Sequence, residues 1–108
     1  MKISLPVKPL SVNAAFQGRR FKTKEARQYD RTLALMLPRA RCEGEFYRIH
    51  YDFFLRNFLM TDWDNLIKVT QDCVVRQGII SDDRRIIEAR VRKFKAPQDR
   101  IEIEIQAA

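Results

Sequence analysis

The sequence predicts an α+β domain of two layers, in which helices pack on one face of a mixed sheet in the order β-α-β-α-β-β. Four segments alternate apolar and polar residues, which is typical of strands with one buried face: residues 2–7, 47–55, 87–91 and 101–105. Two other segments have apolar residues at helical spacing, and they separate the first three strands. The chain has 108 residues, so we expect a single domain over residues 1–108.

The N-terminal third is expected to hold a short strand, a long loop and a helix. Residues 8–22 are expected to be irregular, because they contain residues that discourage regular structure: Pro9, Ser11, Asn13 and Gly18. A loop this long in a compact domain is usually functional. Thr23 is expected to cap a helix that runs to about Leu37, with four apolar residues at helical spacing: Ala26, Tyr29, Leu33 and Leu37.

The rest of the chain is expected to hold three strands and a second helix. Every second residue from Tyr47 to Leu55 is apolar, which makes this the clearest strand. Asp62 or Asp64 is expected to cap the helix that follows, and Gly78 suits its C-terminus. We expect the core to include residues from this helix and the next strand, together with the single tryptophan: Trp63, Leu66, Val69, Cys73, Val74, Ile87, Ala89 and Val91.

The charge balance indicates a polyanionic partner. Basic residues outnumber acidic ones by 21 to 14, a net charge of +7, which suits nucleic acid or an anionic membrane surface. No apolar run reaches the roughly 18 residues of a membrane span, and no signal peptide is evident, so we expect a cytoplasmic protein. Cys42 and Cys73 are expected to be free thiols. His50 is the only histidine, which argues against a zinc site.

The most informative feature is a group of carboxylates with one lysine among them: Asp62, Asp64, Lys68, Asp72, Asp82 and Asp83. The first two lie on the turn into the second helix. Lys68 and Asp72 follow Asp64 at intervals of four residues, so they share a helix face. Carboxylate oxygens are ligands that Mg²⁺ prefers, and bound Mg²⁺ can acidify a water and neutralise charge on a phosphate. The spacing is therefore compatible with a magnesium site for phosphodiester hydrolysis.

An ordinary structural explanation stays open for each of these residues. An aspartate before a helix is usually an N-cap, and two aspartates in a turn are usually turn residues. Lys68 would then be a solvated helix position. Spacing alone does not decide between these explanations and a metal site.

Candidate DNA-binding residues gather in the loop and at the start of the first helix. They comprise five cations, one amide and one aromatic residue: Arg19, Arg20, Lys22, Lys24, Arg27, Asn13 and Phe16. Cations of this kind bind phosphates without reading sequence, and an interleaved phenylalanine can stack on bases. A second basic group runs from Arg84 to Lys95.

The sequence resembles the RusA endodeoxyribonucleases, a family of Holliday-junction resolvases common in phages and prophages. The resemblance covers most of the chain and is strongest from Asp62 to Asp83, in an ordered set of residues: Asp62, Asp64, Asn65, Lys68, Asp72, Gly78, Asp82 and Asp83. Pro6, Ser11 and Asn13 resemble the opening of the family. The chain departs from it at Thr61, where the family often has arginine.

The resemblance implies the RusA fold, a homodimer, and paired cuts in a four-way DNA junction during recombination and repair. It assigns the metal to Asp62, Asp64 and Asp83, a catalytic role to Lys68, and a lesser place to Asp82 and Asp72. The ion would be Mg²⁺, with Mn²⁺ able to replace it. No membrane and no small-molecule substrate is expected.

Two alternatives to a resolvase remain open at this point. One is a less selective metal-dependent nuclease that acts on flaps or duplexes. The other is a non-catalytic, basic DNA-binding module whose carboxylates are only caps and turn residues. A homodimer has its own support in the case of a resolvase, because a junction needs two symmetric cuts and one small domain supplies one.

Overall fold

The computed structural model describes residues 1–17 and 21–108. Gly18, expected in a loop, and Arg19 and Arg20, expected to bind DNA, lie outside the described residues. Within the described residues, no helix is both long enough and apolar enough to cross a lipid bilayer.

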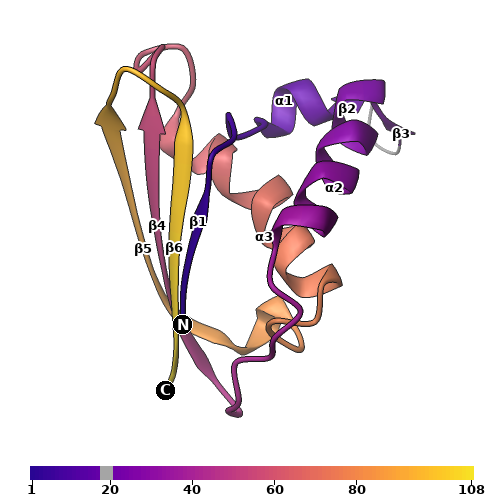
Figure 1. The fold of residues 1–108 in the computed structure, drawn as a ribbon, viewed down its shortest axis with the longest axis vertical. Coiled ribbons are helices and arrows are strands. Elements are labelled where there is room, and N and C mark those ends of the chain that lie inside the picture. Colours follow the sequence, from indigo (N-terminus) through magenta and orange to yellow (C-terminus); the bar gives the residue numbers. More distant parts are fainter. Residues whose placement is uncertain (18–20) are drawn as a thin grey trace.

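The main sheet has four strands, as the alternating segments predict: β1 (Lys2–Leu5), β4 (Tyr47–Leu55), β5 (Ile86–Lys95) and β6 (Arg100–Ala107). Their order across the sheet is β1-β6-β4-β5 (Figure 1). β6 is antiparallel to both of its neighbours, whereas β4 and β5 are parallel. The sheet is therefore mixed, and the predicted fold class is confirmed.

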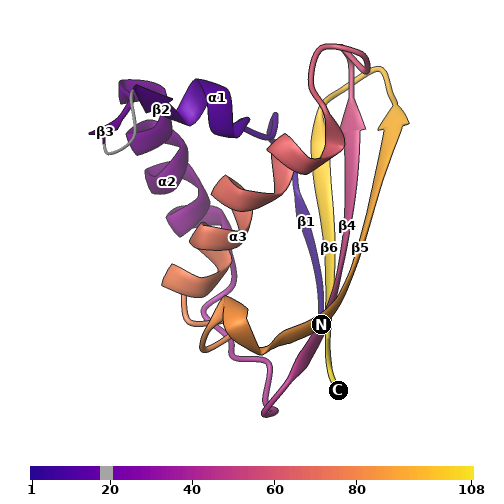
Figure 2. The ribbon, with the colours of Figure 1, turned by 180° about the vertical axis from the view of Figure 1, so that it is seen from behind.

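The parallel pair requires a connection that returns the chain to the end of the sheet where β4 began. Three elements make this crossover: the 3₁₀ turn η1 (Trp63–Leu66), the helix α3 (Ile67–Arg76) and the 3₁₀ turn η2 (Asp83–Arg85). Figure 2 shows the loop at the top of β4 leading down through α3 to the start of β5. All of the candidate acidic residues belong to this one crossover.

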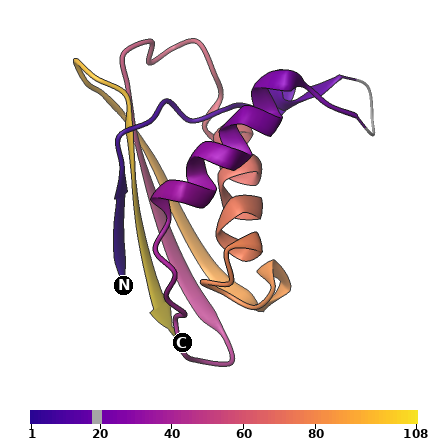
Figure 3. The same cartoon turned by 45° about the vertical axis from the view of Figure 1, so that its right-hand side comes forward.

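The helices α2 (Lys24–Met36) and α3 pack on the same face of the sheet (Figures 1 and 3). Thr23 caps α2 by accepting a hydrogen bond from the Ala26 amide, as predicted. The two helices are joined by a buried hydrogen bond of 2.9 Å between the hydroxyls of Tyr29 and Thr70. No described helix covers the opposite face of the sheet, which is open to solvent.

The core lies between the sheet and this helical layer. It contains the alternate residues of β4 and β6 that face the helices, all of them buried: Tyr47, Ile49, Tyr51, Phe53, Leu55, Ile101, Ile103 and Ile105. Cys73 of α3 is buried against them, as expected, and Cys42 is also a free thiol. Gly78 ends the helix with a φ of +85°, a conformation that favours glycine.

The expectation of an irregular stretch over residues 8–22 is partly wrong. The structure places a helix, α1 (Val12–Ala15), and a small hairpin of two strands, β2 (Phe16–Gln17) and β3 (Phe21–Lys22), within it. The Ser11 hydroxyl caps α1 by accepting a hydrogen bond from a backbone amide of its first turn. Such a cap satisfies an orphan donor and allows a short turn of helix in a segment of weak propensity.

The expected burial of the third strand is wrong at two positions. Ile87 and Ala89 of β5 are exposed, and Val91 is half-buried. Ala89 pairs with the buried Ile49, but β5 is the edge strand, so this side of it lies at the margin of the helical layer. Ile87 lies where the pairing shifts from Tyr47↔Ile86 to Arg48↔Glu88, so it has no partner on β4. Alternation predicted the strand correctly, but it could not predict that helices cover an edge strand only in part.

Candidate active site on the β4–β5 crossover

The loop from β4 into η1 carries Asp62 and Asp64, and both are exposed. Asp62 lies at the N-cap position of η1, but its side chain accepts no capping hydrogen bond. Leu66 is the N-cap residue of α3, and the hydrogen bond at the turn runs from the Asn65 amide to the Asp62 carbonyl oxygen. The predicted cap at Asp62 or Asp64 is therefore wrong, and ordinary capping does not explain these two carboxylates.

The exposed side of α3 carries Lys68 and Asp72. Their side chains form an ion pair of 3.3 Å between Lys68 Nζ and Asp72 Oδ2, which confirms that they share a helix face. Pairs of this kind on a helix surface contribute about 0.3–0.5 kcal/mol. This pairing therefore does little for stability, but it holds the lysine ammonium beside Asp72.

Asp83 lies in η2, at the far end of the crossover. Its carboxylate and that of Asp72 both act on Tyr51, a buried residue of β4 whose hydroxyl donates to Gln71 Oε1 at 3.0 Å. Burial raises the pKa of Tyr51, and the charges of Asp72 and Asp83 raise it further. η2 contacts α3, so Asp72 and Asp83 belong to neighbouring elements of the crossover.

Asp82 and Asp83 are neighbours in the chain but have different partners. Asp82 accepts three hydrogen bonds from Arg84: from the amide at 2.8 Å, from Nε at 3.0 Å and from Nη2 at 2.8 Å. The side-chain hydrogen bonds from Arg84, followed by the backbone one, lower the pKa of Asp82 to about 2. Asp83 has no ion pair within residues 1–17 and 21–108. The turn explanation therefore holds for Asp82, whereas no ion pair among the described residues accounts for Asp83.

The carboxylates of Asp62, Asp64 and Asp83 fit a divalent cation by their chemistry, since exposed oxygen donors suit Mg²⁺ and Mn²⁺. Across the part of the chain that the structure describes, no three histidine, cysteine or acidic side chains are close enough to hold a metal ion. Like charges repel one another, so these side chains would have to converge around a cation. Their assignment as ligands stays a prediction.

Comparison with known proteins identifies the group to which this arrangement belongs. A family model described as Endodeoxyribonuclease RusA matches residues 6–106. The chain belongs to the RusA endodeoxyribonuclease family. It is thus a crossover junction endodeoxyribonuclease, an enzyme that acts on Holliday-junction DNA, and RusA nucleases generally depend on a divalent metal. No curated protein matches the sequence.

In this RusA domain the described cations of the first basic group, Lys22, Lys24 and Arg27, lie at or just before the start of α2. Lys22 pairs with Asp30 at 2.7 Å, and Arg27 donates to the Lys22 carbonyl oxygen at 3.1 Å. Burial acts to raise the pKa of Asp30, but hydrogen bonds from Lys22 and Cys73, with the charge of Arg76, lower it overall. Asp30 therefore stays ionised and offsets part of the positive charge here.

The other candidate DNA-binding residues lie nearby and differ in exposure. Lys24 and Asn13 are exposed, whereas Phe16 is half-buried and packs against the core. The exposed pair can contact DNA as they stand. Phe16 would have to leave its packing to stack on a base, so its predicted role has the weaker structural support.

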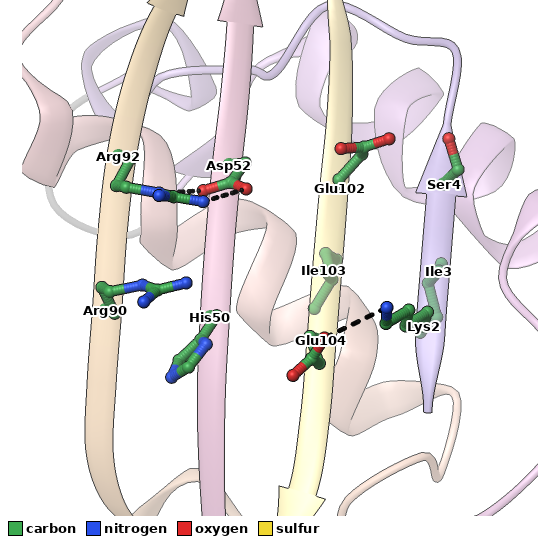
Figure 4. A pocket seen from close by; sticks show the side chains of 10 residues that line it. All are labelled: Lys2, Ile3, Ser4, His50, Asp52, Arg90, Arg92, Glu102, Ile103 and Glu104. Atoms are coloured by element: carbon green, nitrogen blue, oxygen red, sulfur yellow. Dashed lines mark hydrogen bonds and ion pairs between the residues drawn. The ribbon is translucent and has the colours of Figure 1, made fainter.

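Part of the second basic group lies on the open face of the sheet, away from the carboxylates. Figure 4 shows a hollow on this face, lined by residues that include His50, Asp52, Arg90 and Arg92. Arg92 donates two hydrogen bonds of 2.9 Å to Asp52. The hollow therefore does not belong to the candidate site, and its charges are partly compensated within the sheet.

For two residues near the carboxylates the structure differs from the sequence prediction: one was expected in the core, and the contacts of the other were not predicted. Trp63 is exposed rather than part of the core, because η1 begins there and turns its side chain outward. Lys93 of β5 donates to the carbonyl oxygens of Phe58 and Thr61 at 2.6 and 3.0 Å. Nothing in the spacing of Lys93 could have predicted this, because the contact depends on the pairing of β5 with β4.

Proposed function

We propose that this RusA endonuclease resolves Holliday junctions by hydrolysis that depends on Mg²⁺, with Asp62, Asp64 and Asp83 as the ligands of the ion. The observation that carries the proposal is that, within residues 1–17 and 21–108, these three exposed carboxylates lack partners of the kind that account for Asp82 and Asp72. In a protein of net charge +7, unpaired carboxylates on one crossover are poorly explained by folding alone.

The bound metal would acidify a water and neutralise charge on the phosphate. Asp62 and Asp64 offer oxygen ligands at the start of the crossover, and Asp83 offers one at its end. Lys68 is one helical turn beyond Asp64 and points to the same side, so its ammonium can stabilise negative charge that develops on the phosphate oxygens. Asp72 binds that ammonium at 3.3 Å, and we assign it the role of positioning Lys68.

Attack of water on phosphorus forms a new P–O bond and breaks the bond to the 3′ oxygen. The products are a 5′-phosphate and a 3′-hydroxyl, the ends that a ligase can rejoin. This outcome suits a role in DNA recombination and repair, where resolved duplexes must be sealed. We propose a homodimer for the same reason, because two cuts related by symmetry require two copies of this single site.

The proposal is tested with a labelled four-way junction and a linear duplex of matched sequence, each with Mg²⁺ or with EDTA. We expect paired cuts in the junction alone, only with Mg²⁺, and nicks that DNA ligase seals. Sedimentation of the free protein should give the mass of two chains. Equal cutting of both substrates would indicate a less selective nuclease, and binding without cutting would indicate a DNA-binding module; either result contradicts the proposal.

A further inference from the structure

The loop between β4 and η1 displays large apolar side chains to solvent. Leu59 is 89% exposed, Met60 79% and Trp63 56%. Burial of side chains of this size contributes roughly 1.5–3 kcal/mol each, so their exposure is a cost unless a partner covers them. Neighbouring apolar residues that are exposed together mark an interaction site more often than scattered ones do.

The backbone of this loop is held in place, so the exposure does not come from a loose segment. Lys93 Nζ donates to the carbonyl oxygens of Phe58 and Thr61 at 2.6 and 3.0 Å. The same ammonium lies 4.4 Å from the centre of the Phe58 ring, and the Met60 amide donates to the Asn57 carbonyl oxygen at 3.2 Å. Lys93 therefore ties the backbone of the loop to β5, while the apolar side chains of Leu59, Met60 and Trp63 stay exposed.

One of these residues, Trp63, is the direct neighbour in the chain of two candidate catalytic carboxylates. Trp63 stands between Asp62 and Asp64 in the chain, so its Cα is about 3.8 Å from each of theirs. Leu59 and Met60 line a shallow hollow together with Arg56 and Lys95. Among the described residues, the lining of this hollow has two cations and no carboxylate, which suits a ligand that carries phosphates around an apolar centre.

We propose that Trp63, with Leu59 and Met60, forms a stacking platform for bases that become unstacked at the branch point of the junction. The inference rests on the proposed function, since it places the branch beside the scissile phosphate. Apolar wedges and aromatic platforms are the usual means by which proteins hold separated bases. Bases at a branch cost less to unstack than bases within a duplex, so the platform would favour junctions over linear DNA.

A second copy of the chain is a poorer occupant for this surface. If the two loops met across a two-fold axis, each would bring Arg56 and Lys95 against the same residues of its partner. Like charges facing one another oppose association. DNA instead offers flat apolar bases and flanking phosphates together, which match both the apolar residues and the cations.

The test uses the full chain in EDTA, where binding can be followed without cutting. Trp63 is the only tryptophan, so tryptophan emission reports on this one position. Junctions that carry 2-aminopurine at each branch position report on base unstacking from the DNA side. We expect the junction to quench Trp63 emission and to raise the 2-aminopurine signal at one branch position or more, while the linear duplex does neither.

Two variants and a matched control complete the test. Trp63→Ala and the double variant Leu59→Ala/Met60→Ala should lose the 2-aminopurine signal and bind the junction about 5- to 150-fold more weakly, the range that stacking of a base accounts for. Their affinity for the duplex should not change. Leu35→Ala is the control, because Leu35 is 87% exposed but lies on α2, away from the loop. It should behave as the wild type.

Failure of the stacking platform and failure of the proposed function would give different results. Cutting of the junction in Mg²⁺ without quenching of Trp63 in EDTA would overturn this inference and leave the proposed function intact. Quenching without cutting in Mg²⁺ would support the platform and contradict the function. A sedimentation mass that falls from two chains to one in Leu59→Ala/Met60→Ala, but not in Leu35→Ala, would overturn the inference in favour of a loop that joins two copies.

Discussion

The substitution Lys93→Met removes the ammonium that anchors the loop leading to Asp62, and it keeps most of the apolar part of the side chain. The change deletes hydrogen bonds of 2.6 and 3.0 Å to two carbonyl oxygens and a contact of 4.4 Å to the Phe58 ring. A hydrogen bond to a charged group contributes roughly 1.5–3 kcal/mol. Lys93 is half-buried and water competes for it, so we expect the anchor to be worth about 2 kcal/mol in total.

Since a factor of ten corresponds to about 1.4 kcal/mol, losing about 2 kcal/mol should make detachment of the loop roughly 30-fold more frequent. We expect the single-turnover rate of junction cleavage to fall by up to that factor, and the amides of residues 57–62 to exchange faster with solvent. Lys2→Met is the control, because Lys2 lies on the open face of the sheet and its one ion pair among the described residues is with Glu104, at 3.8 Å. Cleavage at the wild-type rate with unchanged exchange in Lys93→Met would refute the reasoning.

Three further predictions follow from the site and the core. Asp83→Asn should abolish cutting and Asp82→Asn should keep it, measured on a labelled junction, because Asp82 is occupied by an arginine; loss of cutting in both would contradict this. Tyr29→Phe should lower the free energy of unfolding by about 1–3 kcal/mol, since it leaves the buried Thr70 hydroxyl without its partner, and adding Thr70→Val should restore part of it in urea titrations. Burial, above all, raises the pKa of Cys73 to about 12, whereas the thiol of the unfolded chain ionises near 9.0. The unfolded state therefore loses the Cys73 proton first, so the free energy of unfolding should fall as pH rises between those values. Melting curves of the wild type and of Cys73→Ala over this pH range measure the effect.

A helix or strand could be predicted from sequence wherever its apolar pattern depends only on which of its own faces is buried. The alternation from Tyr47 to Leu55 and the spacing of Ala26, Tyr29 and Leu33 follow directly from which face is buried. The prediction of burial failed where burial depends on a neighbouring strand or helix. Ala89 is exposed because β5 is at the edge of the sheet, and Ile87 lies where the pairing with β4 shifts register. Neither strand order nor a register shift is visible in alternation.

The candidate site shows the same difference between what a residue's own position in the sequence predicts and what depends on other elements. The acidic residues and Lys68 were identified from spacing and from the resemblance to the RusA family, and the structure places them all on one crossover. Their partners could not be predicted: that Asp82 binds Arg84 and that Lys93 holds the loop depends on local turn geometry and on strand pairing. Trp63 was wrongly assigned to the core, because an apolar residue between two aspartates gives no sign of which way its side chain points.

The proposed metal-dependent cleavage depends most directly on the carboxylate of Asp64. The decisive measurement compares Asp64→Asn with Asp82→Asn for both binding and cutting of a four-way junction in Mg²⁺. We predict that Asp64→Asn no longer cuts but binds the junction at least as tightly as the wild type, because it removes negative charge near the phosphates, while Asp82→Asn still cuts. Cutting by Asp64→Asn at the rate of the wild type would contradict the account.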